Sequence, residues 1–433
     1  MSPRAYVEDM FRSLRVRNYR LFSGAQLVSL SGTWMQTVAQ NWLVLDLTGS
    51  GVALGIVTGL QFLPTALAGL WGGLLADRFS KRRILMWTQG LSGVLAVALG
   101  LLTLTGAVRL WMVYVLALVL GIVTAMDTPA RQAFVIEMVG PEDVANAVGL
   151  NSALFNTARI VGPAIGAVVI ASFGLAAAFL INGASYVGPV MALAAMDGRA
   201  LQRAPRQPKR KGMLREGMAY AWRSRTPRRT LVLMSVVATF GFNFVVTIPL
   251  LVRYTFGGEV GSYAVLTSVA AGGGLVGALW VARRARPTQR LLAGTAAAFG
   301  FFALAASVAP TFGAAAVMLT VAGGAAMAFI ATANSTLQLT TPEHLRGRMM
   351  ALYALVFMGS TPLGGPLVGT ISEHWGPRMG IAVGALATLA AAAAAILTLR
   401  PETMRARAQH APEPIGEPGV PALPGEDTPA RTA

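Results

Sequence analysis

Long uncharged apolar stretches follow one another along almost the whole chain. Seven contain no Asp, Glu, Lys or Arg and are long enough to cross a bilayer core as a helix, which takes roughly 20 residues: 21–45, 51–76, 84–108, 230–252, 261–282, 349–372 and 379–399. Stretches 160–196 and 291–342 have room for two crossings each, with breaks predicted near Phe173-Gly174 and Ala309-Pro310-Thr311. Segment 110–126 completes the set, and the helix after it is predicted to begin near Val144. The pattern predicts an all-α membrane protein with twelve transmembrane helices.

The basic residues between these stretches lie almost entirely on one side of the membrane. Of the 35 Lys and Arg residues, Arg109, Arg253 and Arg378 fall in loops on the other side, and Arg159 falls within a span. By the positive-inside rule, this asymmetry predicts a multi-pass protein of the inner cell membrane with both termini cytoplasmic. The net charge of +17 then sets topology and attracts anionic lipid headgroups. A nucleic-acid partner is not expected, because the charge is scattered over short segments.

Composition narrows the chemistry further. There is no cysteine, which excludes disulfides and thiol chemistry, and no G-x-x-x-x-G-K-[ST] loop for ATP. The three His residues, at 344, 374 and 410, are scattered, and neither a metal-ligand cluster nor a nucleophile constellation is present. We therefore expect no cofactor, no metal and no enzymatic activity.

A polar segment divides the spans six and six. Residues 197–229 are predicted to be a basic cytoplasmic linker between an N-terminal bundle (1–196) and a C-terminal bundle (230–400), and 401–433 a disordered cytoplasmic tail. Within the linker, 213–222 could form an amphipathic helix on the membrane surface. Pro141-Glu142 precedes Gly162-Pro163 much as Pro342-Glu343 precedes Gly365-Pro366. Such repeats underlie transporters whose two bundles rock about a central site.

The end of the second span carries a known signature. Segment 73–83 resembles the G-x-x-x-D-R-x-G-R/K-R/K motif of the major facilitator superfamily, with matches at Gly73, Asp77, Arg78, Lys81 and Arg82 and a departure at Ser80. The resemblance implies the major facilitator fold, two pseudo-symmetric six-helix bundles. It also implies that Asp77 and Arg78 latch the outward-open state against the eleventh span. The competing interpretation is a helix stop followed by topology-setting charge.

The fifth span carries a second motif. Gly162, Pro163 and Gly166 resemble the GPxxGG element that marks exporters and antiporters in this superfamily, with Ala167 in place of the last glycine. Small residues allow close helix crossing, and a proline frees a backbone carbonyl. Ordinary helix packing is the alternative interpretation. Segments 127–133 and 345–348 resemble the enterobactin-exporter and macrolide-efflux-like branch, which implies export of a siderophore or drug-like compound.

Arg159 is the one basic residue predicted inside a span, and burying it requires a partner or water. Asp127, near the cytoplasmic end of the fourth span, is the candidate partner. The pair could belong to a proton-coupled gate or could be a structural ion pair. Proton coupling is implied by the resemblance alone.

A polar stripe on the first span is the best indication of a substrate site. Gln26, Ser29, Thr33, Gln36 and Gln40 recur at three- or four-residue steps, on one face of a helix. We expect this face to line a cavity, with hydrogen bonding between helices as the alternative. Comparable side chains in other spans are Asn182, Tyr186, Phe240, Asn243, Tyr353 and Met358. A lining of aromatic, Met and amide groups suits a bulky amphiphile, and the absence of a deep carboxylate from the first and seventh spans disfavours a cation.

These observations predict a secondary transporter, active as a monomer, that couples proton entry to export of a small amphiphilic molecule. Two alternatives stay open. One is a nutrient importer of the same fold, and the other is a non-transporting membrane partner or permease subunit.

Overall fold

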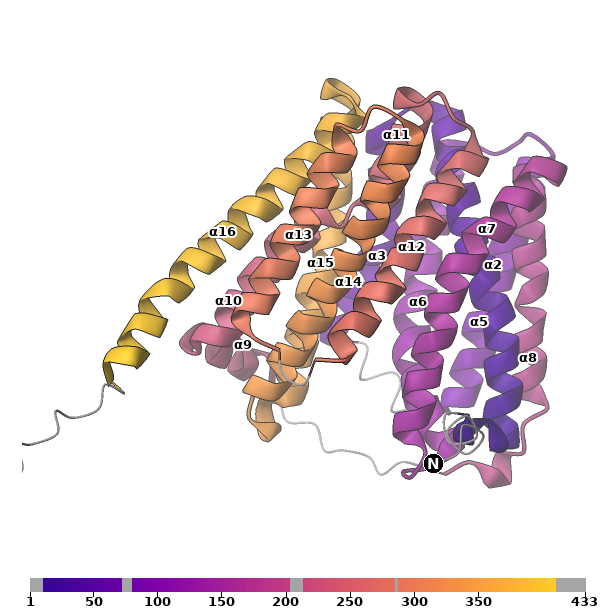
Figure 1. Ribbon diagram of the computed structural model, residues 1–433. Coiled ribbons are helices and arrows are strands. Elements are labelled where there is room, and N and C mark those ends of the chain that lie inside the picture. The colour runs from indigo at the N-terminus through magenta and orange to yellow at the C-terminus, as the bar shows by residue number, and fades with distance from the viewer. Residues whose placement is uncertain (1–10, 72–79, 203–212, 285–286, 410–433) are drawn as a thin grey trace, which may run out of the picture.

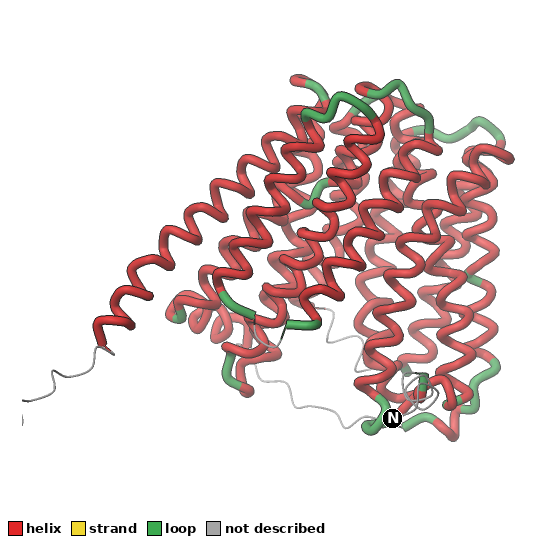
Figure 2. Tube along the Cα trace, in the orientation of Figure 1, coloured by secondary structure: helices red, strands yellow, loops and turns green. Residues whose placement is uncertain are grey.

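Helices account for nearly all of the computed structural model, which describes residues 11–71, 80–202, 213–284 and 287–409 (Figures 1 and 2). In chain order they are η1 (Arg12–Arg15), α2 (Arg17–Thr48), α3 (Gly51–Trp71), α5 (Lys81–Leu104), α6 (Leu110–Val139), α7 (Val144–Ser185), α8 (Val187–Ala194), η2 (Gly198–Ala200), α9 (Met213–Arg223), α10 (Arg225–Val236), the π-helical η3 (Val237–Gly241), α11 (Phe244–Thr255), α12 (Val260–Ala282), α13 (Gln289–Ser307), α14 (Phe312–Thr340), α15 (Glu343–Trp375) and α16 (Pro377–Gln409).

The described helices form a bundle in which the chain crosses the membrane twelve times. Nine segments qualify on length and hydropathy alone, with α7 and α8 taken together as one and α10 and α11 as another, and Gly51–Leu67 is a shorter apolar helix. Left-handed backbone at Gly174 (φ 81°) divides α7 into two legs, which adds a crossing. The twelfth crossing to be counted is α2, which comes first in the chain and whose polar stripe lowers its hydropathy. The predicted fold class is confirmed.

The two predicted chain breaks are where the apolar pattern placed them, and a third break was not foreseen. The legs of α7 meet at Gly174, and α13 ends at Ser307 before α14 begins at Phe312. The seventh crossing was predicted as one continuous helix, but it is interrupted between the π-turn of η3 and the start of α11 at Phe244. Hydropathy does not change across this interruption, so the apolar pattern could not reveal it.

The bundle consists of an N half (α2–α8) and a C half (α10–α16), which meet chiefly through α3 against α15 and α7 against α12. We call the end where α5 and α15 begin the basic end and the opposite one the far end. At the far end one apolar core includes Met35, Leu54 and Phe179 of the N half with Tyr263 and Leu319 of the C half. Two further cores belong to one half each. The ribbons of the halves diverge toward the basic end (Figure 1).

Glycines set the closest approach between the halves. A Cβ at Gly55 of α3 would collide with the Gly365 carbonyl of α15, and one at Gly369 would collide with the Gly51 carbonyl. Backbone therefore packs on backbone there, as small residues permit in membrane bundles. Gly365 belongs to the repeat of the fifth-span motif noted in the sequence.

Two helices extend beyond the apolar stretches that predicted them. The tail was expected from residue 401, but α16 continues to Gln409, and residues 402–409 are good helix formers apart from Thr403; residues 410–433 lie outside the described chain. The uncharged stretch of the fourth span ends at Met126, and α6 continues past it to Val139. Inside the linker, α9 forms at the predicted position with an acidic first turn and a basic last turn.

Candidate functional site

Arg159 lies where the two halves meet, midway along the first leg of α7. Its guanidinium stands over the Trp34 ring of α2, 5.6 Å from the ring centroid, and its Nη1 lies 3.6 Å from the Met327 sulfur of α14. Trp34 in turn contacts the Phe155 ring edge to face, with 5.9 Å between centroids. Ser268 of α12 donates a hydrogen bond to the next carbonyl of α7, that of Ile160 (3.0 Å). The arginine is thus held among aromatic and sulfur groups from both halves.

The fifth-span motif builds this arrangement. A Cβ at Gly162 would meet the Ser31 carbonyl and the Cβ of Trp34, and one at Gly166 would press on Met35. These two glycines therefore let α7 lie directly against α2, which brings Trp34 under Arg159. Pro163 lacks the N–H that would otherwise bond to the carbonyl of Arg159 four residues earlier. The motif works here as a close-packing element within the N half.

Asp127 does not pair with Arg159. Its carboxylate is buried and accepts hydrogen bonds from Thr88 Oγ1 (2.7 Å) and Gln89 Nε2 (2.8 Å), and it forms an ion pair with Arg131 one helical turn away. The predicted coupling pair is therefore separated in the structure. The reason is local: a partner at i+4 on the same helix reaches Asp127 without any tertiary rearrangement.

Two members of the polar stripe on α2 bond to another helix. Gln36 accepts a bond of 2.6 Å from the Asn182 amide on the second leg of α7, and the Thr33 hydroxyl lies 3.1 Å from that of Tyr186. Gln26 and Gln40 are buried as well, but the Gln26 Oε1 has no hydrogen-bond partner among the described residues. The alternative interpretation therefore describes Thr33 and Gln36 in this conformation, because amides buried in an apolar bundle lower their free energy by pairing.

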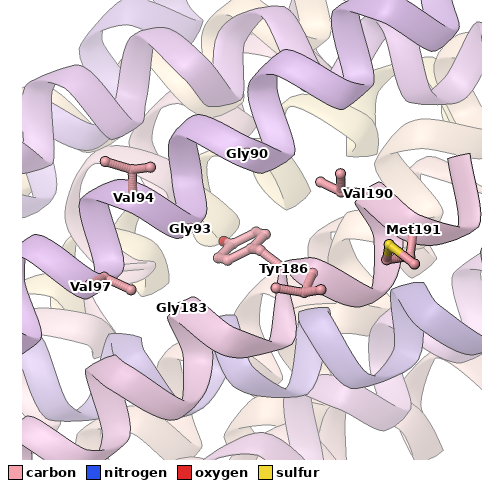
Figure 3. Close-up of a pocket in the computed structure, with 9 residues that line it drawn as sticks. Gly90, Gly93, Val94, Val97, Gly183, Tyr186, Val190 and Met191 are labelled. Atoms are coloured by element: carbon pink, nitrogen blue, oxygen red, sulfur yellow. The ribbon is translucent and has the colours of Figure 1, made fainter. Parts of the chain in front are cut away.

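Tyr186 was predicted in the cavity, but its side chain is buried within the N half and its ring lines an apolar groove there. The groove, about 400 Å³, runs between α5 and the α7–α8 junction, and the Tyr186 ring points into it beside Gly93 (Figure 3). Val94, Val187 and Met191 on its walls are about 60% exposed. Such an exposed apolar wall is a lipid-contacting surface in a membrane bundle.

The predicted residues of the C half lie near the break in the seventh crossing. Asn243 sits in the break, buried, and its amide donates to the Thr239 carbonyl of its own chain segment (2.7 Å). Tyr353 is buried and stacks on Phe357, whereas Phe240 and Met358 are half-buried. Phe242, which the sequence did not single out, packs against three other phenylalanines, namely Phe299, Phe329 and Phe357. This aromatic cluster shields the break.

Polar contacts close the far end between the halves. Arg253 of α11 pairs with Asp46 of α2 (2.5 Å), and the Tyr254 hydroxyl donates to the Gly49 carbonyl (2.7 Å). Glu373 of α15 accepts from the Ser50 hydroxyl (2.6 Å) and the Val52 N–H (3.0 Å) at the start of α3. The hydroxyl bond, then the backbone bond, lowers the pKa of the Glu373 carboxyl. A carboxylate here also faces the positive end of the α3 dipole.

Asn41 adds a deeper link between the halves. Its amide donates to the Tyr263 hydroxyl (2.8 Å) and to the Val245 carbonyl (3.3 Å). Pro249, four residues after Val245, has no N–H to occupy that carbonyl. Asn41 is adjacent to the predicted stripe in sequence but projects toward the other half.

Only part of the second-span signature can be placed. Gly73, Asp77 and Arg78 lie outside the described residues. Lys81 pairs with Glu137 of α6, and Arg82 donates to the Leu193 and Ala194 carbonyls (2.7 and 3.0 Å) at the end of α8. These two basic residues thus tie α5 to its own half, where Arg82 satisfies carbonyls left free by a helix terminus.

Sequence reasoning missed Met327, Asn41 and the far-end contacts of Asp46 and Glu373. The pairing of Asp46 with Arg253 could have been predicted, since these opposite charges lie at span ends on the side of the membrane that has few charged residues. Met327 carried none, because nothing local distinguishes it from other apolar residues of its span.

Residues 9–423 match the transmembrane secretion effector family. The chain is 27% identical to the staphyloferrin A transporter of Staphylococcus aureus over 259 residues, which is 60% of this chain and 65% of that one. It is 28% identical to the multidrug efflux pump Tap of Mycobacterium tuberculosis over 364 residues, 81% of this chain and 86% of the other. A crystal structure of a bacterial homolog to the human lysosomal transporter Spinster, inward-facing and unoccupied, superposes with a TM-score of 0.73 at 18% identity, covering 89% of this chain and 97% of that one.

Proposed function

The chain belongs to the transmembrane secretion effector family, a family of major facilitator transporters, and from that membership we propose that it exports small amphiphilic molecules by alternating access. The observation that carries the proposal is the single apolar core shared by both halves at the far end, set against two further cores that each belong to one half. In this conformation the halves pack together at the far end, and their helices diverge toward the basic end (Figure 1). Alternating access requires a second conformation of similar free energy.

The far-end contacts suit a reversible closure. Asp46 and Arg253 are 42% and 31% exposed, and exposed ion pairs typically contribute only about 0.2–1 kcal/mol each. The glycine contacts between α3 and α15 add shape complementarity without any polar bond that would be costly to break. Several weak contacts of this kind together stabilise the closed far end enough to populate it. Because each is weak, the protein can still leave that state.

We place the basic end in the cytoplasm and both termini with it, in the inner cell membrane, on the charge asymmetry. The helices of the two halves then diverge toward the cytoplasm, the side from which an exporter loads. Membrane lipids surround the bundle, and we propose that it acts as a monomer.

The substrate class follows from the relatives and from the lining. One relative is a siderophore transporter by name and another a multidrug efflux pump. The half-buried Trp34, Met327, Phe240 and Met358 offer soft apolar surface near the middle of the membrane. This chemistry favours a siderophore or a drug-like compound with an aromatic or aliphatic body.

We propose protons as the coupling ion and Asp127 as the group that carries them. It is the one carboxylate of the described chain in the buried class, and its partners on α5 and α6 hold it inside the N half. Asp77 and Arg78, together with Gly73, are proposed to latch the opposite conformation against α15, as the superfamily signature implies.

Two other functions are separable from export. A nutrient importer would have the same fold and conformations, and only the direction of net transport differs. A non-transporting permease subunit would need an ATPase docked on its cytoplasmic loops, which co-purification would reveal.

Everted membrane vesicles test the proposal. Vesicles from cells that overproduce the chain, energised with an acidic lumen, should accumulate a fluorescent amphiphile and lose it when a protonophore is added. Asp77→Asn and Asp127→Asn should each abolish accumulation, whereas Asp143→Asn, which removes a partly exposed carboxylate of the N half, should not. Uptake by right-side-out vesicles instead would establish import, and transport unaffected by the pH gradient would rule out proton coupling.

A further inference from the structure

We infer that Arg159 is the anchoring group for an anionic substrate, bound with its apolar body against Trp34 and Met327. The inference rests on the proposed transport function and names the charge of its cargo: an amphiphile bearing a carboxylate, sulfonate or phosphate. Three elements converge on the group, α7 with the guanidinium, α2 with the aromatic ring and α14 with the thioether.

The depth of Arg159 makes its charge costly. It lies midway between Val144, where α7 begins, and Phe173, where the first leg ends, and therefore near the middle of the bilayer. A cation at that depth requires a counter-charge, hydrogen-bond acceptors or water. Aromatic contact compensates only part of that cost.

Among the described residues, no carboxylate pairs with Arg159. The ion pairs involving described acidic side chains join other cations: Asp127 with Arg131, Glu137 with Lys81, Asp143 with Arg12, Asp46 with Arg253, and Glu216 with Arg348. The elements packed against Arg159 present it with an indole, a thioether and, from α12, a hydroxyl engaged with the Ile160 carbonyl. The guanidinium thus retains donors for a ligand. It is the planar, bidentate group that best matches a carboxylate, sulfonate or phosphate.

The site is approachable from the basic end. Below Arg159 on the same face of α7, Phe155 is 44% exposed and Val148 is 51% exposed. On α14, Asn334 and Gln338 lie two and three turns below Met327 on its face, and their side chains bond to each other. Gln338 is exposed. Polar and aromatic side chains therefore lead from the cytoplasmic side to the arginine.

The fifth-span glycines explain why Arg159 lies over Trp34. Gly162 and Gly166 bring α7 close enough to α2 for Trp34 to support the guanidinium. Met327 contributes from the other half, so a ligand on Arg159 would touch both bundles. A ligand that bridges the halves can bias the conformational equilibrium only through such differential contacts.

Two matched probes test the charge selectivity. Anilinonaphthalene sulfonate and N-phenylnaphthylamine share one ring system and differ in the sulfonate, and both accept energy from protein tryptophans. With protein in nanodiscs and empty-nanodisc signal subtracted, Arg159→Gln should weaken sulfonate binding about 10- to 100-fold, as loss of a charged hydrogen-bond pair does. Binding of the neutral amine should change less than about twofold, which also reports an intact fold. Arg159→Lys should fall between.

Met327 allows the reverse experiment. Met327→Glu places a carboxylate of similar length beside the guanidinium and should displace the anionic probe as strongly as Arg159→Gln does. Met327→Gln has the same size without the charge and should leave sulfonate affinity within about threefold. Equal effects of Arg159→Gln on both probes, no effect on either, or no saturable sulfonate binding by the native chain would each overturn the inference.

Transport measurements separate this inference from the proposed function. If everted vesicles accumulate neither probe while the native chain still binds the sulfonate through Arg159, the export proposal fails and the anion site stands. If the vesicles accumulate the neutral amine as fast as the sulfonate, and Arg159→Gln changes neither rate, export stands and the anion site fails.

Discussion

Two arginines of this protein occupy nearly the same local setting at different depths. Arg253 and Arg159 each lie 5.6 Å over a tryptophan of α2, Trp42 and Trp34 respectively, and each contacts both halves. At the far end, Arg253 has the Asp46 carboxylate at 2.5 Å. In the middle of the bundle, Arg159 has the Met327 sulfur at 3.6 Å.

The difference shows how depth in the membrane changes the free-energy cost of a charged side chain. Near the membrane surface, water screens both partners, so the Arg253 pair contributes little free energy and can open and close. At mid-depth, screening is weak and an arginine without a counter-ion is costly. Arg159 has no counter-ion among the described residues, which is best explained by a ligand that binds and dissociates.

The largest effect should come from removing the close packing under Arg159. Gly162→Val would push a side chain into the Ser31 carbonyl and Trp34, so we expect transport to be lost and stability to fall by about 1–3 kcal/mol, as for other overpacked sites. Thermal unfolding in detergent and vesicle transport would measure both. Gly149→Val, on the same helix with open space around it, is the control. Comparable behaviour of the two variants would contradict the packing argument.

A direct comparison of the two arginines should give the next largest effect. Arg159→Gln should reduce export of an anionic amphiphile at least about tenfold, because a charged hydrogen-bond partner is lost at low screening. Arg253→Gln should reduce it by no more than about threefold. Initial rates in everted vesicles at matched protein levels would decide. Equal losses would mean that depth does not distinguish the two sites.

Removing the ion pair between Asp46 and Arg253 should open the far end modestly. Asp46→Asn should raise the far-end-open population about 1.5- to 5-fold, the Boltzmann equivalent of an exposed pair. The native chain has no cysteine, so spin labels at Thr105→Cys and Glu259→Cys would report the far-end distance without background. Asp143→Asn breaks a partly exposed pair within the N half and should leave the distances unchanged. A shift in that control would point to nonspecific loosening.

The smallest effect should be a dependence on acidic pH through Glu373. Bonds from Ser50 and Val52 lower the pKa of this carboxyl in the closed state, so they stabilise closure fully above its ordinary value of 4.5. Closure should weaken as the pH falls through the lowered pKa. The same spin-label distances, followed from neutral to acidic pH, measure it. Glu373→Gln should remove the dependence, and a midpoint above 4.5 would refute the assignment.

Much of the fold could be predicted from local sequence. The apolar stretches gave the twelve crossings, and Gly174 ended the first leg of α7 where a break was expected. The interruption before Phe244 could not be foreseen, because the residues on both sides are equally apolar.

The site was predicted less well. Gly162, Gly166 and Arg159 were singled out from the sequence. The predicted pairing of Arg159 with Asp127 was wrong, since Asp127 forms its ion pair with Arg131 one turn away on the same helix. Gln36 and Asn182 were expected to face a cavity but bond to each other. Amphipathicity indicates that a polar face is not in lipid, without distinguishing a cavity from another helix.

The sequence by itself determined how often the chain crosses the membrane and where its basic residues gather, because hydropathy and charge act on each segment separately. The tertiary structure alone decided that Arg159 meets Trp34 and Met327, the latter 168 positions away. Such a meeting depends on how closely α7 approaches α2 and how the halves dock. Those distances are set by packing across many helices at once, and no single segment encodes them.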